Sequence, residues 1–149
     1  MWGSHIPVLV EMLKQTTGPV LELGSGMNST PILSVMCKKD GRTFESYDNN
    51  LFWIRILNGE TLYVENFDDV PLERKWSFVL IDHDPSERRI VDIKRLVDYA
   101  DYIVIHDSEP DQEFRYNYSE IYPLFKYRLD YKEFSTHTTI LSNLKEITI

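Results

Sequence analysis

The stretch VLELGSGMNSTP, residues 20–31, decides the fold of this chain. It opens with a short apolar run that suits a buried strand, and a glycine-rich loop at 24–29 follows. Thr30 and Pro31 then predict a helix start, because threonine caps free amides and proline loses nothing at the first helical position. Glycines let the backbone approach a ligand, and the amides of the next helix attract an anion. The stretch therefore predicts a ligand-binding strand–loop–helix unit.

A carboxylate follows the second expected strand. Asp48 lies about 20 residues beyond the glycines, where a carboxylate accepts hydrogen bonds from ribose hydroxyls in nucleotide-binding units. The same position suits a helix-capping aspartate, because Asn49 and Asn50 come directly after it. The third glycine of the dinucleotide fingerprint is missing, since Ser29 and Thr30 occupy that region. NAD and FAD are therefore disfavoured, and a tight turn without any ligand is the alternative.

Apolar runs alternate with helical patterns along the rest of the chain. This alternation, followed by a closing hairpin, predicts an α/β fold with a mostly parallel sheet, helices on both faces and a C-terminal antiparallel hairpin. The connection at 66–75 is too short for a crossover helix, so a loop or single turn is expected there. No linker divides the chain, and we expect a single domain, 1–149. The expected strands are 19–23, 43–47, 61–64, 76–81, 102–105, 127–134 and 138–141, and the expected helices are 6–15, 30–39, 52–57, 86–99 and 118–125.

The bulk composition limits the partners and the compartment. The formal net charge is −8, and phosphate backbones repel such a surface, so we expect no nucleic-acid partner. Acidic residues interrupt the basic residues of the 86–99 helix, which we interpret as a solvated face. The lone cysteine, Cys37, is expected to be a buried apolar side chain. No membrane-spanning stretch and no secretory pattern appear, so a cytoplasmic protein without a membrane partner is expected. The basic residues are Arg88, Arg89, Lys94 and Arg95.

Two polar clusters follow the fourth and fifth expected strands, at the end of a parallel sheet where ligands bind. They are Asp82-His83-Asp84 and His106-Asp107-Ser108. The two strands should be neighbours, so the clusters are expected to meet. Histidine removes a proton from a hydroxyl near neutral pH, while Asp82 and Asp107 suit orienting a histidine or binding Mg²⁺. The alternative is that these residues only cap helices and satisfy loop backbone.

The stretch at 20–26 resembles the first signature motif of the class I S-adenosylmethionine (SAM)-dependent methyltransferases. Asp48 matches the acidic residue that ends the second strand of that family. The resemblance implies a Rossmann-like methyltransferase fold, a loop that holds the methionine part of SAM, a contact of Glu22 with its amino group and a contact of Asp48 with its ribose. A further acidic contact to the adenine amine falls at Asp68. The expected cofactor-binding residues are Glu22, Gly24, Ser25, Gly26, Asn28, Ser29, Thr30, Asp48, Asn49 and Asp68.

The two polar clusters resemble those of the catechol O-methyltransferase type of small-molecule O-methyltransferase. Asp82-His83 and Asp107-Ser108 match three of the four positions of that pattern. Ser108 replaces its asparagine, and Pro85 stands near the place of its catalytic lysine. The clusters also resemble the cephalosporin-hydroxylase and sugar O-methyltransferase-like branch. The catalytic residues are therefore expected among Asp82, His83, His106 and Asp107, with Asp82 and Asp107 as the ligands if Mg²⁺ is used.

These features together predict a SAM-dependent methyltransferase that transfers the methyl group to oxygen of a small molecule. No part of the chain forms a large lid, so the acceptor is small or a second copy of the chain completes the site as a homo-oligomer. The alternatives are a SAM-binding or adenosine-binding module without turnover and, less favoured, an NAD-linked enzyme. We interpret His5, beside Trp2, as part of a frayed N-terminus rather than as a residue that folds over the cofactor.

Overall fold

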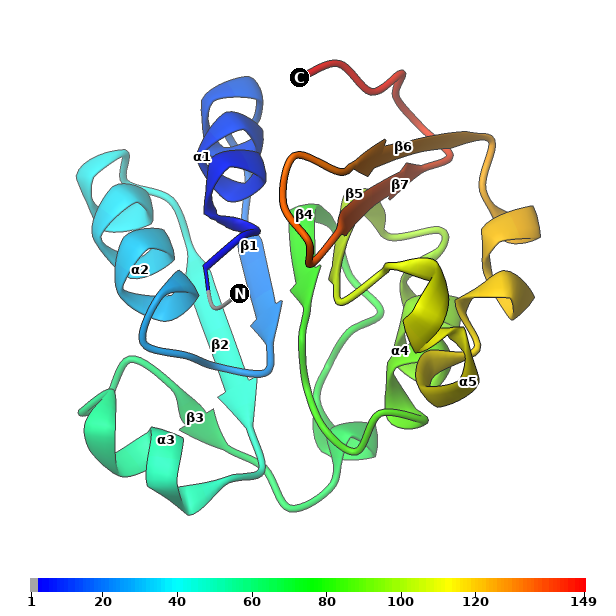
Figure 1. Cartoon of the computed structure of the whole chain (residues 1–149). Helices are drawn as coiled ribbons and strands as arrows, with labels where there is room; N and C mark the ends of the chain where they lie inside the picture. The colour runs from blue at the N-terminus through cyan, green and yellow to red at the C-terminus, as the bar shows by residue number, and fades with distance from the viewer. Residues whose placement is uncertain (1–2) are drawn as a thin grey trace.

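The computed structural model describes residues 3–149, so Trp2 lies outside the described part. A seven-stranded sheet in the order β3-β2-β1-β4-β5-β7-β6 forms its centre (Figure 1). The first five strands run parallel, and β7 is antiparallel to both of its neighbours. The α/β fold with a C-terminal antiparallel hairpin is therefore confirmed. The strands are β1 Val20–Leu23, β2 Phe44–Asp48, β3 Leu62–Tyr63, β4 Trp76–Ile81, β5 Ala100–His106, β6 Tyr127–Tyr131 and β7 Thr138–Ser142.

Helices cover both faces of the sheet, and every residue of the central strands β1, β4 and β5 is buried. Double-sided cover explains why these strands are near-continuous apolar runs. On one face α1 and α2 pack against alternate strand residues such as Val20 and Phe78. On the other face α4 and the turns after β5 pack against Leu21 and Val79. The helices are α1 Ile6–Gln15, α2 Ser29–Lys39, α3 Leu51–Ile56, α4 Arg88–Leu96 and α5 Glu113–Tyr116.

Most predicted elements are present, and the boundaries that differ have local causes. The expected helix at 118–125 is wrong: two single 3₁₀ turns, Tyr118–Glu120 and Tyr122–Leu124, replace it. Asn117 has a φ of 53°, which ends the preceding helix, and Pro123 cannot donate a helical hydrogen bond. The short connection at 66–75 holds one 3₁₀ turn, as expected.

The structure also shows the roles of Asn50 and Cys37 and the character of the helices. Asn50 caps α3, because its side chain accepts a hydrogen bond from the Phe52 amide. Cys37 is fully buried, as expected. Within residues 3–149, none of the helices has both the length and the apolar character needed to cross a bilayer.

Candidate functional site

A cavity of about 250 Å³ opens at the carboxyl ends of the parallel strands, where the sequence places the polar loops. A second cavity of about 80 Å³ adjoins it. The two share Ser25, Trp53 and Asp82, so they form neighbouring parts of one cleft. The larger is lined by Gly3, His5, Ser25, Gly26, Met27, Asn28, Ser29, Trp53, Asp82, His106 and Asp107, and the smaller by Ser25, Asp48, Asn49, Asn50, Trp53, Asp82, His83 and Asp84.

Gly24 and Gly26, in the loop after β1, have different structural roles. Gly24 has a φ of 89°, and a Cβ there would lie 2.4 Å from the backbone carbonyl carbon of Asp82. Gly24 therefore lets the loop after β1 cross the loop after β4. A Cβ on Gly26 would meet nothing nearer than the Ser29 hydroxyl at 3.9 Å, and Gly26 lines the larger cavity. Of the two, Gly26 is the residue that leaves room for a ligand.

Asp48 ties the glycine loop to the start of α3. Its Oδ2 accepts hydrogen bonds from the Ser25 amide at 2.7 Å and the Ser25 hydroxyl at 3.0 Å, and its Oδ1 accepts one from the Asn50 amide at 2.7 Å. The side chain is nearly buried yet lines the smaller cavity. Each carboxylate oxygen has two lone pairs, so Oδ1 keeps the capacity to accept a further donor.

Glu22 lies beneath the loop and lines neither cavity. Its carboxylate is fully buried and accepts hydrogen bonds from the hydroxyls of Ser29 at 2.5 Å, Thr30 at 2.7 Å and Ser46 at 2.5 Å. Burial raises the pKa of Glu22 to about 7, and the three hydroxyl donors oppose that rise. Glu22 thus joins the start of α2 to β2. Thr30 does not cap α2 as expected: the helix begins at Ser29, and the Thr30 hydroxyl accepts the Gly26 amide at 3.0 Å.

The buried Glu22 carboxyl predicts a measurable pH dependence of stability. Its pKa is about 7 in the folded chain against 4.5 as its ordinary value, so the folded state binds an extra proton between these pH values. This contribution to the free energy of unfolding is present below pH 4.5 and is lost as the pH rises to about 7, by about 3 kcal/mol in all. We expect Glu22→Gln to remove that loss in urea titrations at pH 4.5, 6 and 8, and Glu65→Gln, at an exposed position, to keep it. Equal pH profiles for Glu22→Gln and the wild type would contradict the assignment.

The remaining expected cofactor contacts divide between the cavity wall and the outer surface. Asn28 and Ser29 line the larger cavity, and Asn49 lines the smaller one while its amide donates to the Asp84 carbonyl at 3.0 Å. Asp68 lines neither cavity and is exposed. Its carboxylate pairs with Arg88 at 2.6 Å.

The clusters after β4 and β5 meet, as predicted, through Asp82 and His106. His106 Nδ1 lies 3.3 Å from Asp82 Oδ1 and 3.5 Å from Asp107 Oδ1, and its Nε2 lies 3.1 Å from the Ser4 hydroxyl. Burial works against protonation, but the hydrogen bond and charge of Asp82 outweigh it and hold the pKa of His106 above its usual 6.5. Asp82 and His106 therefore form a polarised pair at the wall of the larger cavity.

The second histidine of the clusters, His83, borders the smaller cavity, but no part of its side chain is exposed there, so the structure does not support the expected catalytic role. Its side chain has no exposed surface; Nε2 pairs with Asp92 of α4 at 2.9 Å, and the ring packs on Phe67 at 4.4 Å. Burial holds the pKa of His83 below its usual value, although Asp92 works in the opposite direction. Successive residues after a strand point to opposite faces, so Asp82 faces the cleft and His83 faces α4.

Arg89 is a buried part of the site that the sequence interpretation missed. Its side chain is 3% exposed, and the guanidinium donates to Asp82 Oδ1 at 3.0 Å and lies 3.6 Å from Asp107 Oδ2. It also stacks over the Tyr116 ring at 4.3 Å. The expectation of a solvated basic face is therefore wrong at Arg89. A positive group already lies between the two carboxylates, so the expected Mg²⁺ site between Asp82 and Asp107 is not supported.

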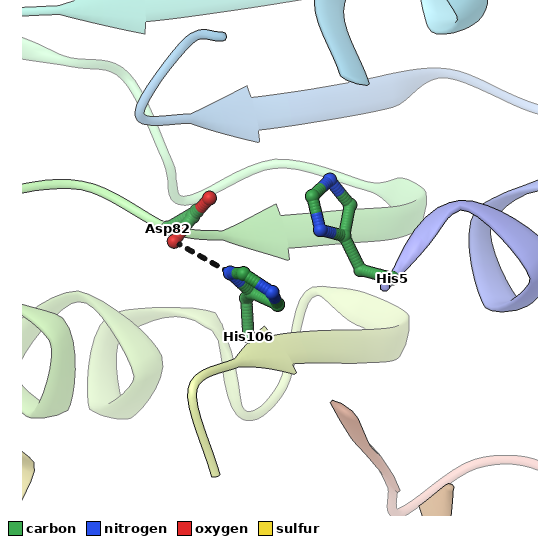
Figure 2. Close-up of side chains that lie close together, drawn as sticks. All are labelled: His5, Asp82 and His106. Carbon is green, nitrogen blue, oxygen red and sulfur yellow. Dashed lines mark hydrogen bonds and ion pairs between the residues drawn. The ribbon is translucent and has the colours of Figure 1, made fainter. Parts of the chain in front are cut away.

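The expectation that His5 belongs to a frayed N-terminus is also wrong. It is 4% exposed at the N-terminus of α1, and its ring centre lies 4.3 Å from that of His106. Figure 2 shows His5 reaching from α1 towards Asp82 and His106, which come from the ends of β4 and β5. Burial and the neighbouring His106 lower the pKa of His5 to about 4. The predicted helix at 6–15 was the available signal, because it placed His5 at a helix terminus rather than in a frayed end.

Comparison with known proteins supports the fold. No protein-family model matches the chain, and no curated protein matches it. Solved structures do match. One is the METTL16 catalytic domain in complex with MAT2A 3'UTR hairpin 1, with a TM-score of 0.61, 10% identity and coverage of 97% of this chain and 70% of that chain. Another is the N-terminal domain of human METTL16 in complex with SAH, with a TM-score of 0.57, 9% identity and coverage of 93% of this chain and 68% of that chain. A third is the T. thermophilus 16S rRNA methyltransferase RsmC in complex with AdoMet and guanosine (0.57, 17%, 97% and 41%). The chain thus has the Rossmann-like methyltransferase fold.

The comparisons also bear on length and on partners. The chain spans 66% of a METTL16 methyltransferase domain and 41% of RsmC. The expectation that nucleic acid is excluded as a partner is wrong, because the structures of this fold include one in complex with the MAT2A 3'UTR hairpin and an rRNA methyltransferase. The physical reason is that a net charge of −8 describes the whole chain and says little about the surface around one cleft.

Proposed function

We propose that this chain is a SAM-dependent methyltransferase. The observation that supports the proposal most is the cleft at the carboxyl ends of the strands, which has Gly26 at one side, Asp48 at another and the Asp82–His106 pair at a third. A bound nucleoside needs room beside a loop and a carboxylate that accepts its hydroxyls, which Gly26 and Asp48 provide. A reacting hydroxyl needs a proton acceptor, which the Asp82–His106 pair provides. The fold matches structures in complex with SAH and AdoMet.

In this proposal the residues of the cleft divide into binding and reacting groups. The loop at 24–29 accommodates the methionine part of SAM, with Asn28 and Ser29 as its polar lining. Asp48 accepts a ribose hydroxyl at Oδ1, and Asn49 lies beside it. Glu22 acts as a positioning residue, because it holds the start of α2 without reaching the cleft. Bound SAM supplies an electrophilic methyl group, and the protein supplies orientation.

We assign the proton-accepting role to His106. Asp82 accepts from Nδ1–H and orients the ring, which leaves Nε2 to take a proton from an acceptor hydroxyl in the place that the Ser4 hydroxyl now occupies. The raised pKa of His106 means that the base form is lost as the pH falls through a value above 6.5. The proposed acceptor is a hydroxyl group, and a small molecule fits the modest cavity. RNA also carries 2′-hydroxyls, so both acceptor classes belong in the assay.

The test of cofactor binding is a calorimetric titration of the wild-type chain with S-adenosylhomocysteine and SAM. We expect one binding event with either ligand and no heat with NAD. Gly26→Val should remove the binding, because the added methyl groups fill the space that the loop leaves open in the larger cavity. No heat and no thermal shift for the wild type at millimolar ligand would make the proposal wrong.

The control for Gly26→Val is its own thermal unfolding followed by circular dichroism. A Cβ at this position meets no atom within 3.9 Å, so the midpoint is expected to stay near that of the wild type. Unchanged affinity in a folded Gly26→Val protein would place the ligand outside this loop.

Asp48→Ala should weaken the binding of S-adenosylhomocysteine. The substitution removes an acceptor for the ribose and loosens the Ser25 amide that Asp48 holds. The expected loss is about 1.5–3 kcal/mol, roughly ten- to a hundredfold in affinity. The matched control is Asp98→Ala, at an exposed position in the turn after α4, which should bind as the wild type does. Equal affinities for the two variants would remove Asp48 from the binding site.

A binding module without turnover is the second candidate, favoured by the Ser4 hydroxyl that already lies at hydrogen-bonding distance from His106 Nε2. The two candidates separate when labelled SAM is incubated with the protein and mixed acceptors, RNA and small hydroxylated molecules together. A methyltransferase transfers label to one class of acceptor, whereas a binding module returns SAM unchanged.

A further inference from the structure

We propose that His5, Asp82 and His106 form a binding site for a divalent transition-metal ion of the zinc or iron type. This goes beyond the proposed function, because metal binding at these residues requires neither SAM nor an acceptor. The three side chains come from the start of α1, the end of β4 and the end of β5, so the tertiary fold alone brings them together (Figure 2).

The geometry of the three side chains suits coordination. One ligand atom from each lies within 4.8 Å of the others, and the two imidazoles and the carboxylate all line the larger cavity. A small inward movement of side chains would bring these atoms to the distances of a bound ion. The cavity keeps the opposite side of such an ion open to water or to an acceptor oxygen.

His5 supplies an independent observation that points to a ligand. The residue is 4% exposed, yet neither Nδ1 nor Nε2 has a hydrogen-bond partner among residues 3–149. Buried polar atoms almost always have a partner, since leaving one unpaired costs stability. A metal ion at the wall of the cavity would satisfy one of these nitrogens and account for a histidine held there by the first turn of α1.

The donor set selects the kind of metal. Imidazole suits zinc, copper, iron and nickel, whereas magnesium and calcium prefer oxygen ligands throughout. Two histidines and one carboxylate on one side of an ion, with open positions opposite, are the ligand pattern of catalytic zinc and non-haem iron sites. Arg89 donates to Asp82 Oδ1 at 3.0 Å, which is an outer contact of the kind that orients a metal-binding carboxylate.

A bound ion would change the role of His106. As a ligand it would no longer accept a proton, and the ion would lower the pKa of a bound hydroxyl instead. The metal-free and metal-bound forms therefore use the same three residues in different ways.

The test is titration of metal-free, tag-free protein with Co²⁺, followed by visible absorption and equilibrium dialysis, with Zn²⁺ as competitor. We expect one equivalent of Co²⁺ with an absorption band typical of nitrogen ligation, displaced by Zn²⁺. Loss of an outer partner costs roughly 10–100-fold in metal affinity. We therefore expect His5→Gln and His106→Gln to lose more than about 100-fold.

The matched control is His137→Gln, because His137 is a histidine that lines neither cavity and does not belong to the cluster. It should bind Co²⁺ as the wild type does. A wild type that takes up no stoichiometric Co²⁺, or a His137→Gln protein that loses as much affinity as His5→Gln, overturns the proposal. The wild-type stoichiometry and absorption band decide the question even if a variant at His5 or His106 fails to fold.

The same metal-free protein is titrated with S-adenosylhomocysteine. Binding of S-adenosylhomocysteine without any uptake of Co²⁺ overturns the metal site and leaves the proposed function standing. Uptake of Co²⁺ without binding of S-adenosylhomocysteine supports the metal site and contradicts the proposed function.

Discussion

Arg89→Met is expected to destabilise the chain by about 3–5 kcal/mol, because it leaves two partly buried carboxylates without their positive partner and two backbone carbonyls without their donor. The Arg89 side chain is 3% exposed. Its guanidinium donates to Asp82, approaches Asp107 and also donates to the backbone carbonyls of His83 and His106. Methionine fills much of the same volume and supplies none of these donors. The measurement is the free energy of unfolding in urea at pH 7.

Arg115→Met is the matched control for this substitution. Arg115 also lies over the Tyr116 ring, at 5.2 Å against 4.3 Å for Arg89, but half of its side chain is exposed. Its ion pair with Asp84 is in solvent, so the expected loss is within about 1 kcal/mol. Similar losses for the two variants would show that ring stacking, rather than charge pairing with Asp82, accounts for the effect.

Gly24→Ala is expected to prevent stable folding or to cost about 3 kcal/mol or more, the sum of a strained backbone and an overpacked contact. The φ of 89° is one that residues with a side chain rarely adopt. The new Cβ would lie 2.4 Å from the carbonyl carbon of Asp82 and 2.4 Å from the amide nitrogen of His83, and backbone cannot rotate away as a side chain can. The clash separates the loops that follow β1 and β4.

Gly26→Ala provides the comparison, because the two glycines are two residues apart in one loop. Its Cβ would meet no atom nearer than 3.9 Å. We therefore expect the free energy of unfolding to change by less than about 1 kcal/mol. Far-ultraviolet circular dichroism and urea titration of both variants show whether only Gly24 is required for folding. A stable Gly24→Ala protein would mean that the loops do not cross as closely as the structure has them.

Sequence patterns were reliable where a feature depends on near neighbours along the chain. The helix at Ile6–Gln15 and the strand at Trp76–Ile81 have the predicted bounds, because each has a full apolar stripe or run. In the helix after β4, however, the buried face carries charged residues as well as Ile93 and Leu96. Arg89 lies four residues before Ile93 and seven before Leu96, which is the spacing of one helical face. The hydrophobic pattern did not reveal it, since arginine is normally counted with the solvated side.

The histidines show where prediction from the sequence ended. His83 and His106 each lie at the carboxyl end of a buried strand and next to an aspartate. The sequence therefore predicts the same catalytic role for both. In the structure His83 packs under α4 against Asp92, and His106 reaches the cleft beside Asp82. His5 joins His106 although 101 positions of sequence separate them. Such contacts depend on which face each side chain takes after its strand.

The sequence by itself therefore determined the order of the elements, the parallel sheet with its antiparallel hairpin, and the end of the sheet at which the polar loops collect. These follow from local periodicity and from the turn preferences of Gly24 and its neighbours, which act over a few residues. Only the tertiary structure decided that Arg89 pairs with Asp82, that Glu22 lies beneath the loop, and that His5 lines the cleft beside His106. Each of those contacts joins segments distant in the chain, and their partners are selected by packing and by the cost of an unpaired buried charge, which no local pattern records.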